Sequence, residues 1–490
     1  MNKKIATKNI VSSIMLQVVN MISGFIVPRI ILSTFGSEVN GLVSSLNQFL
    51  GYISLFEGGI TGVVTASMYE PIVRHDQYRI SRNIKTADLF FRKIAVIFFM
   101  YTIVLSIVYP MVVDIEVSFG YVCLLVWVMC ISLFVQYFFS LSMKVLLNAD
   151  KKIYVVCTTQ AVIVILNTLL TIIISRICSS IHLIRLCSSC LYILQPVIWN
   201  YYVKKSFCID GTVAPDPGII AQRWDGFGIN MAAFIHNNTD VVVLTLLASL
   251  KEVSVYSVYF LVVTGLKSLI VSVSSAMAPN IGQAYAGEDI EELRDKFRKY
   301  EFTILYLTHI VFTVGGLCIT PFVQLYTRNI HDADYNQPLF GWMIVMAEMI
   351  FCIRDPYVTL AYSANRFKDF TRTAYFEASL NIVLSVIFVA KYGLIGVAAG
   401  TLISMGYRTI MQIGYLHKHI LHKSILGLFK NLIGFSAGTL VVIVCSGNLI
   451  NIGTLSFTGW FQFAFKNAVF AFIVFSILAY LLYRLDEKSY

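Results

Sequence analysis

Charge is scarce in this sequence. Only 13% of its 490 residues are Asp, Glu, Lys or Arg, about half the share found in an average soluble domain. Hydrophobic residues make up 57%, and the mean hydropathy is +0.75. A soluble protein cannot bury that much apolar surface, so lipid must cover part of it. No polar block is long enough to form a soluble domain, which excludes a large catalytic domain.

Several catalytic motifs are also missing. The sequence contains no G-x-x-x-x-G-K-[ST] loop for nucleotide phosphates. It contains neither the H-E-x-x-H motif of zinc proteases nor the G-x-S-x-G motif of serine hydrolases. The nearest acidic motif, Asp332 and Asp334 in HDADY, is interpreted as solvated. We therefore expect no enzyme activity, no ATP hydrolysis and no cofactor.

The net charge of +10 does not predict nucleic-acid binding, because the basic residues lie mostly in short loops between apolar segments. Ten cysteines are present, most of them inside apolar segments. One pair, Cys187 and Cys190, has C-x-x-C spacing, but no second pair completes a four-ligand zinc site. Neither a nucleic-acid partner nor a metal site is expected.

Long apolar runs dominate the chain and predict an all-α integral membrane protein. A spanning helix needs about 20 largely apolar residues. The first apolar run continues to about Leu32, longer than the core of a signal peptide, so it is interpreted as a retained helix. The fourteen predicted spans cover 8–33, 41–66, 94–113, 119–143, 153–175, 181–202, 226–248, 253–276, 301–325, 339–363, 372–390, 393–416, 425–446 and 459–483.

Loop charge predicts the orientation. With the amino terminus in the cytoplasm, most Lys and Arg residues fall on the cytoplasmic side, as the positive-inside rule requires. The outer segments 34–40 and 114–118 contain no Lys or Arg. An even number of spans then places both termini in the cytoplasm.

Four landmarks recur about 206 to 214 residues apart and indicate an internal repeat. They predict two six-helix lobes, 1–205 and 206–420, related by a pseudo-two-fold axis along the membrane normal, with two additional helices at 421–490. The matched pairs are Phe91-Arg92-Lys93 with Phe297-Arg298-Lys299, Pro71 with Pro279, Arg29 with Asp240, and Asn167 with Asn381.

Cations inside the predicted spans are the first candidates for substrate binding. A charge at the centre of a spanning helix costs roughly 2.5–3.5 kcal/mol or more, so it usually faces a cavity or a partner. Arg29, Lys267 and Arg354 lie in apolar segments and could bind a large anionic headgroup. Arg29 could instead snorkel to the interface. Arg354 and Asp355 are adjacent and do not share a helix face, so each should have its own partner.

Acidic and polar residues in the spans are candidates for coupling. Glu57 could pair with a cation from another helix or bind a proton. The run 236–240, His-Asn-Asn-Thr-Asp, is the most polar stretch in any span and should line an aqueous cavity or a helix interface. Asn237 and Asn238 are therefore candidate substrate contacts, and Asp240 joins Glu57 as a candidate coupling residue. Glu348 and Glu377 are further candidate relay groups.

Short motifs occur along the whole chain at characteristic spacings. They are Pro28-Arg29, Phe35-Gly36, Gly41-Leu42, Gln48 and Gly58-Gly59 in the first half, and Asn237-Asn238-Thr239-Asp240, Val255-Tyr256-Ser257 and Pro279 in the second. This pattern resembles the polysaccharide flippases (Wzx-type translocases of O-antigen and capsule units) of the multidrug/oligosaccharidyl-lipid/polysaccharide exporter superfamily. The resemblance lies in spacing more than in identity.

This resemblance implies a multi-pass protein of the bacterial inner membrane that flips undecaprenyl-pyrophosphate-linked oligosaccharides to the outer leaflet by alternating access. It implies a cationic cavity, to which Arg29, Lys267 and Arg354 correspond by position. The implied partners are the lipid-linked oligosaccharide, membrane lipids, a polysaccharide polymerase and a chain-length regulator. The energy could come from the membrane potential or from H⁺ or Na⁺ exchange. The alternative is another exporter of the same fold, either a lipid II flippase or a multidrug antiporter.

Overall fold

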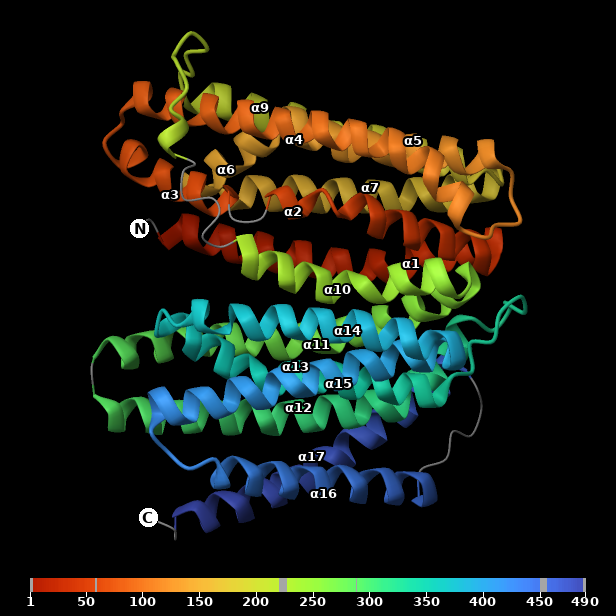
Figure 1. The fold of residues 1–490 in the computed structure, drawn as a ribbon, viewed down its shortest axis with the longest axis vertical. Helices are drawn as coiled ribbons and strands as arrows, with labels where there is room; N and C mark the ends of the chain where they lie inside the picture. The colour runs from red at the N-terminus through yellow and green to blue at the C-terminus, as the bar shows by residue number, and fades with distance from the viewer. Residues whose placement is uncertain (1–2, 58–59, 220–226, 288, 450–455, 488–490) are drawn as a thin grey trace. The chain divides into compact units, whose positions relative to one another are not determined.

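The computed structural model describes residues 3–57, 60–219, 227–287, 289–449 and 456–487. Every regular element within these ranges is a helix (Figure 1). Eleven of the helices are long and apolar enough to cross a membrane. The predicted all-α membrane class is therefore confirmed.

The chain divides into two compact units. The first comprises Met1–Phe234 and Ser249–Ser254, and the second comprises Ile235–Ala248 and Val255–Tyr490. The boundary passes through α10 (Phe227–Leu247) and α11 (Leu250–Ala286). The predicted division into 1–205, 206–420 and 421–490 stays a prediction.

The first unit contains α1 to α9, and α7 lies along α1. Hydroxyl groups join these two helices, with 2.7 Å between Ser23 Oγ and Thr168 Oγ1. The helices are α1 (Lys3–Gly51), α2 (Ser54–Glu57), α3 (Ile60–Val73), α4 (Gln77–Val112), α5 (Phe119–Phe139), α6 (Leu141–Ala149), α7 (Ile153–Ile177), α8 (Ile181–Tyr192) and α9 (Leu194–Ser206).

The second unit contains the helices after α11, and within it α16 and α17 both pack on α12 (Figure 1). A π-helical turn, η3, joins α15 to the segment before α16. The elements are α12 (Ile290–Tyr326), α13 (Pro338–Ser363), η2 (Phe367–Phe370), α14 (Thr371–Tyr392), α15 (Leu394–Leu416), η3 (His417–Leu421), α16 (Leu426–Leu449) and α17 (Phe457–Glu487).

Length and apolarity support eleven of the fourteen predicted spans. The exceptions are 41–66, 226–248 and 339–363. The first is divided among α1, α2 and α3, and only Asn238–Leu247 of the second stands out as a short apolar helix. The third forms α13 but carries three charged residues, Glu348, Arg354 and Asp355. Most described residues of the three segments are helical, but a turn at residues 52–53 interrupts the first. The differences from the predicted spans therefore lie in continuity and charge.

Two helices begin well before the predicted positions. The sequence predicts spans that start at 94 and 301, whereas α4 begins at Gln77 and α12 at Ile290. Each start is capped, because the Asp76 and Asp289 carboxylates accept hydrogen bonds from backbone N–H groups of the first turn. Hydropathy identifies only the apolar part of a helix, so it misses these polar amino-terminal extensions.

A glycine separates the first predicted span from the second. Gly36 has φ 83° and ψ −179°, a conformation that side chains with a Cβ rarely adopt. The predicted outer loop 34–40 is therefore a sharp kink within α1 rather than an extended connection.

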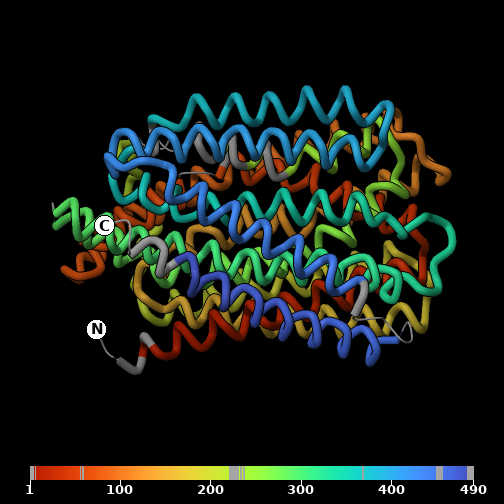
Figure 2. Tube along the Cα trace, turned by 90° about the horizontal axis from the view of Figure 1, so that it is seen from below, coloured from red at the N-terminus to blue at the C-terminus, as the bar shows by residue number. Residues whose placement is uncertain are grey.

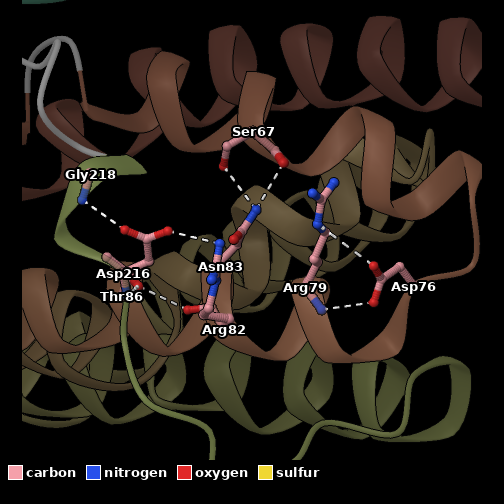
Figure 3. Close-up of polar contacts among 8 residues, drawn as sticks. All are labelled: Ser67, Asp76, Arg79, Arg82, Asn83, Thr86, Asp216 and Gly218. Carbon is pink, nitrogen blue, oxygen red and sulfur yellow. Dashed lines mark hydrogen bonds and ion pairs between the residues drawn. The ribbon is translucent and has the colours of Figure 1, made fainter.

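The segment after α9 follows a fixed course over α4 within the first unit (Figure 3). The Arg82 guanidinium lies 2.8 Å from the Asp216 carboxylate, and the Asp216 backbone N–H donates to Thr86 Oγ1 at 2.8 Å. The Asp210 backbone N–H donates to Ser81 Oγ at 3.1 Å. Because the Arg82–Asp216 pair is about one-third exposed, it contributes at most about 1 kcal/mol.

Helix α14 packs along α15 (Figure 2), and Gly400 of α15 permits the close approach of the two backbones. A Cβ on Gly400 would lie 2.9 Å from the Ser385 backbone nitrogen. We expect Gly400→Ala to lower the free energy of unfolding by about 1–3 kcal/mol, because backbone cannot move aside easily. Thermal unfolding in detergent measures this. Gly406→Ala is the control, since nothing lies within 4 Å of its added Cβ. Equal melting temperatures for the two variants would contradict the prediction.

Candidate functional site

Asp240 lies at the centre of a buried polar cluster in the second unit. Its side chain is contributed by α10 and is only 6% exposed. Thr401 on α15 donates to the two carboxylate oxygens at 3.0 and 2.9 Å, and Tyr256 on α11 donates at 3.0 Å. Asn381 on α14 donates to Thr401 Oγ1 at 2.9 Å. Three other helices therefore supply hydroxyl and amide groups around one buried carboxylate.

A small cavity adjoins Asp240. Its volume is about 20 Å³, and its lining includes Tyr256, Thr401 and a second carboxylate, Glu348 of α13. A space of roughly 10–15 Å³ is enough for a water molecule. Oδ1 of Asn381, which is fully buried, has no hydrogen-bond partner within the described part of the chain. Carboxylate, hydroxyl and amide oxygens are suited to a small hard cation or a proton.

Lys267 of α11 neutralises Glu348. Its Nζ lies 2.9 Å from Glu348 Oε2, and the lysine side chain is 20% exposed while the glutamate is 6% exposed. The same Nζ lies 3.6 Å from the ring centroid of Phe351, close enough for a cation–π contact. Lys267, which the sequence predicts to bind substrate, is therefore partly exposed. Its counter-ion Glu348 also lines the cavity at Asp240.

Arg354 has a different environment. It is 3% exposed and lies 3.3 Å from Glu377 on α14, which also pairs with Arg408 on α15 at 2.5 Å. In this conformation Arg354 neutralises a buried carboxylate, so its predicted contact with substrate stays a prediction. Asp355 accepts a hydrogen bond from Ser274 on α11. The prediction that Arg354 and Asp355 have separate partners is confirmed.

The remaining candidates are described in part. Glu57 of α2 accepts hydrogen bonds from Tyr137 at 2.8 Å and from Thr61 at 3.1 Å, and belongs to the first unit. Arg29 is half-buried on α1 of the same unit. Asn238 is half-buried on α10, two residues before Asp240. The side chain of Asn237 and the predicted glycine pair 58–59 lie outside the described residues.

Two residues of the site are not predicted from the sequence: Thr401, which donates to Asp240, and Arg408, which pairs with Glu377. Thr401 carries no signal, because a lone threonine in an apolar helix is usually hydrogen-bonded to its own backbone. Loop charge assigns Arg408 to the inner ends of the helices, whereas it is 14% exposed and pairs with Glu377. Arg408 lies eight residues before the end of α15, and this distance from the helix end is the feature that could have indicated a buried position.

The fold is similar to those of solved membrane transporters. One is described as the lipid II flippase MurJ in an inward closed conformation, with TM-score 0.75, 15% identity, and coverage of 96% of this chain and 99% of that chain. Another is an inward-facing multidrug resistance MATE family transporter of the MOP superfamily, with TM-score 0.64, 14% identity, and coverage of 83% and 99%. A third is the MATE multidrug transporter DinF-BH, solved as a complex, with TM-score 0.59, 14% identity, and coverage of 86% and 97%.

No protein-family model and no curated protein sequence matches the chain. The structural likeness at 14–15% identity shows the fold. That fold is the one shared by MurJ and the MATE transporters, and none of these three structures is described as an enzyme.

Proposed function

We propose that this protein flips an undecaprenyl-pyrophosphate-linked oligosaccharide across the bacterial inner membrane by alternating access, without an ATPase of its own. The observation that carries the proposal is Lys267, a partly accessible cation in an apolar helix that is paired with one buried carboxylate. The match to the lipid II flippase supports it, because that match extends over nearly all of both chains. The MATE matches leave a larger part of this chain uncovered.

The pyrophosphate would bind to the Lys267 ammonium group in place of Glu348. An anionic group that reaches this ammonium replaces Glu348 as its counter-ion, and charge-assisted bonds to phosphate are among the stronger polar contacts. Arg29, Arg354 and Asn238 remain candidate contacts for the rest of the headgroup. The polymerase and the chain-length regulator remain proposed partners in the same membrane.

Coupling would centre on Asp240. When the pyrophosphate displaces Glu348 from Lys267, Glu348 and Asp240 both face one small cavity without a cation. Two buried carboxylates favour uptake of H⁺ or Na⁺ there. The membrane potential offers a second driving force, since moving a negative charge outward releases roughly 2.3 kcal/mol per 100 mV. Flipping in liposomes under an imposed Na⁺ gradient, pH gradient or potential separates the three.

A second candidate function is export of a cationic compound by the same fold. The pair of carboxylates Asp240 and Glu348 at one cavity favours it. Drug accumulation in cells that lack the protein distinguishes the two candidates. Accumulation of drug with normal surface polysaccharide would replace the flippase proposal by this one.

Lys267→Ala is the direct test of substrate binding. We expect flipping to fall by about 10- to 100-fold, because a charge-assisted bond to phosphate contributes roughly 1.5–3 kcal/mol. The gene is deleted in its host, and the deletion strain is complemented with wild type or variant. The measurement is the amount of lipid-linked oligosaccharide that stays on the cytoplasmic face.

Loss of the lysine also leaves Glu348 buried without its counter-ion, which destabilises the fold. The double variant Lys267→Ala, Glu348→Gln removes that charge, so it should recover expression and thermal stability without recovering flipping. Full flipping by the double variant would assign Lys267 a purely structural role. Normal polysaccharide in the deletion strain would overturn the proposed function itself.

A further inference from the structure

A second cavity lies in the second unit, where the first turns of α12, the π-helical turn η3 and the start of α16 come together. Its volume is about 210 Å³, well above the roughly 10–15 Å³ that one water molecule needs. The polar residues that line it are Arg294, Arg298, Glu301, His417, Lys423 and Asn431. It shares none of them with the cavity at Asp240.

The lining is cationic. Three cations, Arg294, Arg298 and Lys423, line the cavity with one carboxylate, Glu301, which accepts a hydrogen bond from the Tyr357 hydroxyl. Arg298 also pairs with Asp295 at 3.1 Å, and the cations still outnumber these two carboxylates. Arg294 also donates to the carbonyl oxygens of Leu421 at 2.6 Å and of His422 at 3.0 Å. These bonds hold the wall of the cavity in place, and the net positive charge favours an anionic ligand.

Asn431 supplies an independent sign of a ligand. Its side chain is 3% exposed and lines the cavity, yet its Oδ1 has no hydrogen-bond partner within the described ranges. A buried amide oxygen without a partner costs roughly 1–3 kcal/mol. A hydroxyl or ammonium donor of a bound molecule would remove that cost.

The outer face of α16 beside the cavity is apolar. Leu426, Phe429 and Ile433 are 76%, 54% and 67% exposed, and their spacing places them along one side of the helix. Gly427, Leu428 and Asn431 of the same helix face the cavity. A ligand with a phosphate-bearing headgroup and hydrocarbon chains could place the headgroup in the cavity and the chains against the apolar side of α16.

We infer that this cavity binds the phosphate-bearing headgroup of a membrane phospholipid. Arg298 and Lys423 contact the phosphate, Asn431 accepts from a donor on the headgroup, and the acyl chains lie along Leu426, Phe429 and Ile433. The lipid belongs to the inner leaflet in the predicted orientation. This site is separate from the one proposed for the transported substrate.

The test uses the purified full-length protein in detergent, titrated with phosphatidylglycerol or phosphatidylethanolamine and followed by native mass spectrometry and thermal unfolding. We expect saturable binding that raises the melting temperature. Lys423→Ala and Arg298→Ala should each weaken it by about tenfold, and Asn431→Leu should weaken it as well. Lys423→Arg keeps the charge and should retain binding, which separates loss of the site from misfolding.

Lys296→Ala is the matched control. Lys296 lies on the same part of α12 but pairs with Glu292 on the exposed surface and does not line the cavity. Equal weakening by Lys296→Ala and Lys423→Ala would overturn the site in favour of general surface charge. Inorganic phosphate or glycerol phosphate that saturates the protein as tightly as the lipid would overturn the lipid assignment and identify a soluble anion instead.

Discussion

Glu377→Gln should lower the free energy of unfolding by about 3–5 kcal/mol, the usual cost of removing one partner from a buried ion pair. Glu377 is fully buried and accepts from Arg354 and Arg408. Without its charge, two guanidinium groups stay inside the second unit with no carboxylate between them. Thermal or denaturant unfolding in detergent measures the loss.

Two further variants test that explanation. Glu292→Gln removes the carboxylate of an exposed pair with Lys296 and should change stability by no more than about 1 kcal/mol. The triple variant Glu377→Met, Arg354→Met, Arg408→Met replaces the whole network by apolar side chains and should recover much of the lost stability. Wild-type stability in Glu377→Gln would show that the two arginines do not depend on this carboxylate.

Asp240→Asn should abolish coupled transport while leaving the fold intact. The amide keeps the shape of the carboxylate, but Thr401 and Tyr256 then face a neutral group. We expect the affinity for the coupling ion to fall by about 100-fold or more, since bonds to a charged group contribute roughly 1.5–3 kcal/mol each. Flipping in liposomes at graded Na⁺ concentration and pH measures this.

Asp334→Asn is the control for that experiment. Asp334 lies in the segment between α12 and α13, where it accepts from the Asn336 backbone N–H at 2.9 Å, and its replacement should leave transport unchanged. Undiminished flipping in Asp240→Asn would remove Asp240 from the coupling mechanism. Undiminished flipping in Glu57→Gln as well would leave the membrane potential as the remaining driving force among those considered.

The candidate site was predictable from the sequence only in part. The polar run 236–240 identified Asp240, because hydrocarbon does not tolerate such a stretch. Tyr256 and Thr401, which donate to it, and Asn381, which donates to Thr401, come from three other helices. Which helices pack together, and which faces they present, depends on long-range contacts that spacing along the chain does not encode.

Arg354 illustrates the same limit. Its place in an apolar helix predicted a charge that needs a partner, and that much is confirmed. Whether the partner is a substrate or a carboxylate depends on Glu377, 23 residues away on α14, and on Arg408 of α15. The burial of Arg354 at 3% exposure follows from that packing.

The membrane class, the helical content and the approximate positions of eleven of the fourteen predicted spans follow from the amino-acid sequence alone. Hydropathy over about 20 residues is a local property, and it governs whether a helix partitions into lipid. Three features emerge only from the folded structure: the kink at Gly36, the polar beginnings of α4 and α12, and the pairing of Lys267 with Glu348. These depend on caps, backbone conformation and neighbouring helices. A buried charge must find its partner in three dimensions, and the chain brings that partner from a distant helix.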